Sequence, residues 1–166
     1  MAAALLLAHW SCGYHVAGTA DTLPETIHTI AVPAFTNGTT EYKIEQYMTA
    51  AVVDELISRT RYRVVPNESN ADARLQGSVV GFYAVPSNFD PATQRATSVT
   101  IVANLSVTLW DIHSGQAIYQ NPNLEHRGRY EVSVDPDVYF EERQAAIVRS
   151  SESIARTLVS AVLEGF

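Results

Sequence analysis

The residue with the clearest chemistry in this chain is its only cysteine, Cys12. A short apolar run, Ala2 to Ala8, precedes it, and a single thiol cannot form an intrachain disulfide. A cysteine directly after an apolar leader is typical of an acylated, exported protein. We therefore interpret residues 1–11 as a signal segment and Cys12 as a lipid-modified N-terminus. The alternative is an incidentally buried cysteine, because no Lys or Arg precedes the apolar run.

Two sets of arginines have a spacing that suits anion binding. Arg59, Arg61 and Arg63 are spaced by two across a predicted helix-to-strand junction, and Arg127 and Arg129 are spaced by two on one strand face. A guanidinium group binds phosphate or carboxylate through paired donors. The alternative is a solvated sheet edge, with charge compensation at the end of a helix.

Catalytic and metal-binding patterns are not recognised in the sequence. The five histidines show no metal-ligand spacing, and the Asp111–His113 pair falls in a predicted turn, where Asp is favoured for local hydrogen bonds. No glycine-rich phosphate loop and no Gly-x-Ser-x-Gly elbow occurs. We therefore expect no enzymatic activity, no cofactor and no metal site.

Length and charge limit the number of domains and the kinds of partner that the chain can have. The chain has 166 residues and a net charge of −7. We expect a single domain over residues 12–166, and the negative charge argues against nucleic acid as a partner. No run of about 20 apolar residues occurs, so no transmembrane helix is predicted.

Two helices are predicted from apolar residues spaced three and four apart. The first covers Glu41 to Thr60, after a polar loop that can supply an N-cap. The second begins at Asp135-Pro136-Asp137, where Asp is suited to the N-cap and Pro to the first helical position, and it ends before Gly165.

Alternating and β-branched segments predict the strands. Thr26 to Val32 and Tyr62 to Pro66 flank the first helix, which favours a parallel crossover unit. Later strands are predicted at Ala73 to Val85, at Ser98 to Trp110 and, after a turn at Asp111 to Gly115, as a return strand from Gln116. We expect Asn121-Pro122-Asn123 to interrupt this return strand, with alternation resuming from Leu124 to Val134, and Pro86 to Thr97 to be a long loop. The predicted fold is α+β, a two-layer sandwich of two long helices on a small mixed or antiparallel sheet of about four to five strands.

The order of motifs along the chain resembles that of the lipopolysaccharide-assembly lipoprotein (LptE) family. The resemblance begins at Cys12-Gly13-Tyr14-His15-Val16-Ala17-Gly18 and continues through Leu23-Pro24 and Ile27 to Phe35. It then covers Ile44-Glu45-Gln46, Asp54-Glu55-Leu56, Tyr62-Arg63-Val64-Val65 and the final amphipathic helix. It therefore extends over nearly the whole chain after Cys12.

The resemblance implies a non-enzymatic lipoprotein that is acylated at Cys12 and sits on the periplasmic side of the outer membrane. It implies a role in plugging and assembling an LptD-type β-barrel that delivers lipopolysaccharide to the outer leaflet. Arg95, Arg127 and Arg129 correspond most nearly to the family's lipopolysaccharide contacts. The alternatives are a free-standing periplasmic lipoprotein that binds a soluble ligand or another envelope component in a deep pocket, and a small hydrolase, which would need a cluster of perturbed titratable groups.

Overall fold

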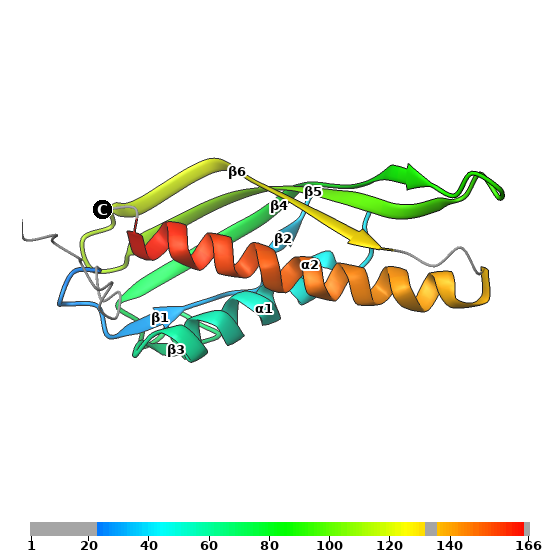
Figure 1. Cartoon of the computed structure of the whole chain (residues 1–166). Helices are drawn as coiled ribbons and strands as arrows, with labels where there is room; N and C mark the ends of the chain where they lie inside the picture. Colours follow the sequence, from blue (N-terminus) through cyan, green and yellow to red (C-terminus); the bar gives the residue numbers. More distant parts are fainter. Residues whose placement is uncertain (1–22, 132–135, 165–166) are drawn as a thin grey trace, which may run out of the picture.

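The computed structural model describes residues 23–131 and 136–164, without the side chains of residues 136–141. Cys12 and the predicted signal segment lie outside the described residues. Over the described part, the chain forms two helices and one mixed sheet of six strands (Figure 1). The α+β class and the mixed sheet are as predicted. The strand number exceeds the predicted four to five because the short strand β2 (Thr36–Asn37) lies in a segment that sequence analysis interprets as a loop.

The first half of the chain forms the predicted crossover unit. Helix α1 (Ile44–Arg59) connects strand β1 (Thr29–Ala31) and the short β2 to strand β3 (Arg63–Val65), and β1 pairs in parallel with β3. Every fourth residue of α1 is buried: Ile44, Met48, Val52 and Leu56. The expected N-cap is absent, because Lys43 occupies that position at φ 60° without a side-chain cap.

The second half of the sheet consists of three long antiparallel strands. They are β4 (Ala73–Phe89), β5 (Ala96–Asp111) and β6 (Ala117–Glu131), and the sheet order is β3-β1-β4-β5-β6, with β2 also paired to β4. On β5 the predicted alternation is confirmed, since the alternate residues Val99, Ile101, Ala103, Leu105, Val107 and Leu109 are all buried.

The loop predicted from Pro86 to Thr97 is wrong over half of its length. Strand β4 continues to Phe89 and β5 begins at Ala96, so the turn shrinks to residues 90–95. Register shifts at Asn88 accommodate the nearby proline, which a regular ladder excludes. In the same way, β6 runs through Pro122 without a break, with a register shift opposite β5 between Leu105 and Val107.

Helix α2 (Pro136–Glu164) packs on α1 and along β5 and β6. Both helices lie on the same side of the sheet, and the molecule is elongated (Figure 1). The described chain begins at one end, near β3, while the β4–β5 turn lies at the other end. Neither described helix has both the length and the apolar composition needed to cross a membrane.

Gly77 allows β4 to approach a buried aromatic ring. A Cβ atom at Gly77 would overlap the Phe35 side chain, which is itself almost completely buried. The glycine inside this strand therefore marks a close approach, as its position in an alternating segment predicts.

We predict that Gly77→Val lowers the free energy of unfolding by about 3 kcal/mol, because Phe35 must leave its position. Chemical denaturation measures the change. Gly115→Ala is the matched control: Gly115 has φ 69° and open space around it, so only the left-handed backbone costs about 1 kcal/mol. Equal losses in the two variants would contradict the proposed overlap.

Candidate interaction surface

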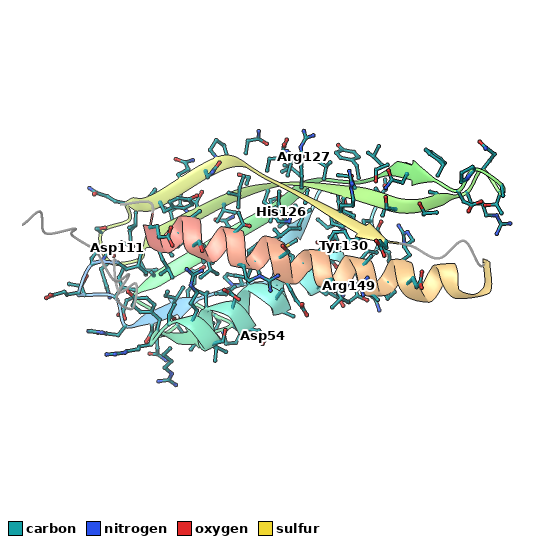
Figure 2. The ribbon with its side chains drawn as sticks, viewed as in Figure 1. Asp54, Asp111, His126, Arg127, Tyr130 and Arg149 are labelled. Carbon is teal, nitrogen blue, oxygen red and sulfur yellow. The ribbon has the colours of Figure 1, made fainter. Side chains whose placement is uncertain are left out.

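The outer face of the sheet, opposite the helices, carries two arginines and several apolar side chains. On β6, His126 and Arg127 point to opposite sides, with His126 toward α2 and Arg127 away from it (Figure 2). Alternation places Arg129 on the same outer side as Arg127. The structure therefore brings together two of the three arginines that the family resemblance indicated.

Cross-strand register defines the neighbours of these arginines. Arg127 lies opposite Val102, which lies opposite Tyr83, and Arg129 lies opposite Thr100, which lies opposite Val85. Directly opposite side chains on one sheet face are in contact range. We call the resulting surface the arginine face, and its members are Tyr83, Val85, Thr100, Val102, Arg127 and Arg129.

The distal half of β4 gives this face its apolar character. Tyr83 is 59% exposed and Val85 is 51% exposed, and Phe89 further along the strand is 57% exposed. A bulge at Val80 shifts the register, so that Tyr83 and Val85 turn outward while Phe82 and Ala84 turn toward α2. This surface was not predicted from the sequence, although the break in polarity at Val80 and Phe82 is typical of a bulge.

The two arginines differ in how they are held. The Nε of Arg127 donates a 2.7 Å hydrogen bond to Oε1 of Glu125. This hydrogen bond lowers the pKa of Glu125 and raises the pKa of Arg127. No ion pair within the described residues involves Arg129, which is exposed. Arg129 can therefore bind an external anion without giving up a protein partner.

Arg95 is separated from the arginine face. It lies in the β4–β5 turn, whose backbone closes through hydrogen bonds between Asp90 and Arg95 and between Gln94 and Asp90. The Asp90 side chain accepts hydrogen bonds from Ala92 and Thr93, and the bonds from Thr93 contribute most to its lowered pKa. Arg95 is five residue steps along the chain from Thr100, the partner of Arg129, so Arg95 lies roughly 17 Å beyond Arg129.

The inner side of β6 carries a half-buried histidine against α2. The Nδ1 of His126 lies 3.3 Å from Oγ1 of Thr157, and its Nε2 has no hydrogen-bond partner among the described residues. Burial, together with the positive charge of Arg156, lowers the pKa of His126. The folded protein therefore favours the neutral imidazole at this contact.

The described residues hold no group of three or more His, Cys, Asp or Glu side chains placed to bind a metal ion. The Asp111–His113 pair lies in the predicted turn, where Oδ1 of Asp111 accepts hydrogen bonds from the backbone N–H groups of His113 and Ser114. The predicted turn-forming role of Asp111 is thus confirmed. The hydrogen bond from Ser114 is the largest cause of the lowered pKa of Asp111.

Comparison with known proteins gives one sequence-family match and several structural matches. The family model described as LptE, lipopolysaccharide-assembly, matches residues 27–162. No match is found among curated protein sequences.

The structural matches share low sequence identity with this chain. A putative lipoprotein from Caulobacter crescentus matches with a TM-score of 0.56 at 15% identity, over 84% of this chain and 91% of that one. The dodecamer of a PelC variant from Paraburkholderia phytofirmans matches with a TM-score of 0.56 at 16% identity, over 83% and 87%. Lipoprotein B from Nitrosomonas europaea matches with a TM-score of 0.54 at 13% identity, over 90% and 91%. At these identities the likeness concerns the fold.

We predict that acidification from pH 7.5 to 5.5 lowers the melting temperature partly through His126. Its depressed pKa gives stability that is complete above the unfolded pKa of about 6.5 and is lost as the pH falls toward the folded pKa. His126→Gln should therefore show a smaller fall in melting temperature over this range. His28→Gln, at an exposed position just before β1, is the control and should keep the wild-type fall. An unchanged pH dependence in His126→Gln would contradict the assignment.

Proposed function

Because the chain belongs to the lipopolysaccharide-assembly (LptE) family, we propose that it is an envelope lipoprotein that plugs an LptD-type β-barrel. In this role it helps the barrel assemble in the outer membrane and helps lipopolysaccharide reach the outer leaflet. The observation that carries the proposal is the family match over residues 27–162, which includes all six strands and α1 and nearly all of α2.

The proposed anchor is Cys12, on the periplasmic side of the outer membrane. Gly13 follows it, in place of the aspartate that the family resemblance associates with retention at the inner membrane. One acyl chain binds a bilayer only marginally, whereas two or more hold a protein firmly. Several acyl chains on Cys12 would therefore attach the domain without any membrane-spanning segment.

The surface of the described domain suits a plug. The lumen wall of a large β-barrel is polar and wet, so a domain that fills it needs polar contacts more than a continuous apolar face. The elongated shape and the polar residues along the exposed sides of both helices fit such a lumen (Figure 1). The proposal therefore needs no large apolar docking surface.

The arginine face is the proposed contact for lipopolysaccharide. Arg127 and Arg129 provide donors for its phosphate groups, while Tyr83, Val85 and Val102 provide an adjacent apolar surface. Arg95, at the β4–β5 turn, would meet a different part of this large ligand or of the barrel. The neighbouring Glu125 limits Arg127, because an anion must compete with the existing ion pair.

The alternative of a free-standing lipoprotein that binds a soluble ligand requires a deep apolar pocket. Between β4, β5 and the start of α2, the described residues leave a cavity of about 30 Å³. Pockets for small molecules are roughly 300 Å³ or larger and mostly apolar. The hollow of about 410 Å³ beside β1 is large enough, but it is an open groove whose lining includes the charged or polar residues Glu25, His28 and Arg61. No observation favours this alternative over the barrel plug.

We predict that Cys12→Ser moves the protein from the outer-membrane fraction to the soluble periplasmic fraction, because the proposed acyl chains are lost. Cell fractionation measures this shift, and mass spectrometry of the wild-type N-terminus identifies the modification. Detergent-solubilised wild-type protein should also co-purify with a large β-barrel protein. Recovery of an unmodified peptide that spans Cys12, or purification without any barrel, would overturn the respective part of the proposal.

We predict that Arg129→Ala weakens lipopolysaccharide binding about tenfold, the loss of one or two charge-assisted hydrogen bonds. Arg127→Ala should have a smaller effect, since Arg127 already bonds Glu125. Glu125→Gln should tighten binding, because it releases the Arg127 guanidinium. Titration with purified lipopolysaccharide measures all three. Equal affinity in the wild type and in Arg129→Ala would remove the arginine face as the binding site.

A further inference from the structure

A second arginine pair lies at the end of the molecule where the described chain begins. There an open groove of about 410 Å³ lies beside the first described residues, β1 and the segment before β3. Its lining residues are Leu23, Pro24, Glu25, Ile27, His28, Arg61 and Tyr62. The β4–β5 turn lies at the opposite end (Figure 1). The groove is therefore separate from the arginine face and from Arg95.

Alternation along the edge of the sheet turns Arg61 and Arg63 outward. Tyr62 and Val64, which alternate with them, pack against the hydrophobic core. Arg63 pairs with Thr29 in the register of β1 and β3, and the backbone N–H of Arg63 donates a hydrogen bond to the backbone carbonyl oxygen of His28. Both arginines are thus exposed: Arg61 lines the groove, and Arg63 follows two residues later at the start of the edge strand β3.

Unlike the neighbouring Arg59, Arg61 and Arg63 form no ion pair with the described residues and can therefore bind an external anion. Arg59 is engaged, since it lies 3.8 Å from Glu55 and 3.4 Å from Glu164. Within the described residues, no ion pair involves Arg61 or Arg63. Among the described residues, this end of the molecule therefore presents two arginines without an ion-pair partner, in a chain whose net charge is −7.

The nearby carboxylates oppose these charges only in part. Oδ2 of Asp72 accepts hydrogen bonds from the N–H groups of His28 at 2.9 Å and Thr29 at 2.8 Å, and Oδ1 lies 3.4 Å from Nε2 of His113. Glu25 is the one carboxylate among the residues that line the groove. Within the described residues, neither Asp72 nor Glu25 forms an ion pair with Arg61 or Arg63.

The covalent path to Cys12 begins at this same end. Eleven peptide units join Cys12 to Leu23, and a fully extended chain of that length reaches at most about 40 Å. A tether this short keeps the groove end at a high effective concentration next to the bilayer that holds the anchor. Even a weak attraction between this end and the membrane surface then fixes the orientation of the domain.

We propose that Arg61 and Arg63 bind the phosphate groups of anionic phospholipids in the leaflet that holds the Cys12 acyl chains. The inference rests on the lipid anchor of the proposed function, which supplies the reason for this end to face the bilayer. Bound in this way, the domain stands with its β4–β5 turn directed away from the membrane. The pair acts as a second, electrostatic attachment point next to the covalent one.

The test measures vesicle binding of the full chain carrying Cys12→Ser, so that no acyl chain contributes. Co-sedimentation is measured with vesicles of 30% phosphatidylglycerol in phosphatidylcholine and with pure phosphatidylcholine vesicles, at low and physiological salt. We expect binding to the anionic vesicles that weakens with salt. Arg61→Ser with Arg63→Ser should reduce it roughly 30-fold, the equivalent of about 1 kcal/mol per arginine. Glu25→Gln should strengthen it severalfold.

Two control variants separate this role from general charge and from folding. Arg149→Ser with Arg156→Ser removes the same charge from exposed positions on α2 and should leave binding near the wild-type level. Arg61→Lys with Arg63→Lys keeps the charge and should retain most of the binding. Absence of wild-type binding, equal binding to both vesicle types, or wild-type binding by the double serine variant would overturn the inference. Because the assay uses neither acylation nor the barrel, its failure is distinct from failure of the proposed function.

Discussion

Burial of only one face of the sheet is the constraint on which the rest of this structure depends. The inward residues of β5 pack with the apolar stripe of α2, in which Ile154 and Leu158 are fully buried. Because side chains alternate along a strand, fixing one row inward fixes the other row outward. The positions of Arg127 and Arg129 on the wet face are a direct consequence. A register slip of one residue would bury both guanidinium groups, at a large cost in free energy.

The sequence pattern predicted those elements whose conformation depends on their own side chains and not on the strand or helix beside them. The strict alternation of β5, the burial of every fourth residue of α1 and the turn at Asp111 to Gly115 follow from rules that concern one element at a time. The parallel pairing of β1 with β3 follows from chain order. These features need no knowledge of the remaining fold, which is why they could be predicted.

The features that sequence analysis missed depend on pairing between strands. Proline normally ends a strand, but register shifts near Pro86 and Pro122 allow the ladder to continue past both residues. The bulge at Val80 turns Tyr83 outward, and the break in polarity at Val80 and Phe82 indicates an irregularity whose register only the partner strand defines. The arginine face could be predicted in part, since the spacing of Arg127 and Arg129 places them together. Their apolar neighbours from β4 and the separate position of Arg95 required the register.

The arginines without an ion-pair partner are informative because acidic residues are in excess in this chain. With 18 acidic residues against 11 basic ones, partners for an arginine are abundant. Arg59, Arg74, Arg127 and Arg143 all have carboxylate partners among the described residues. Arg61, Arg63, Arg129, Arg149 and Arg156 have none there, and of these only Arg61, Arg63 and Arg129 lie on or beside strands of the sheet. An unpaired guanidinium binds an external anion without first losing a protein partner, so these positions, rather than net charge, locate the proposed anionic ligands.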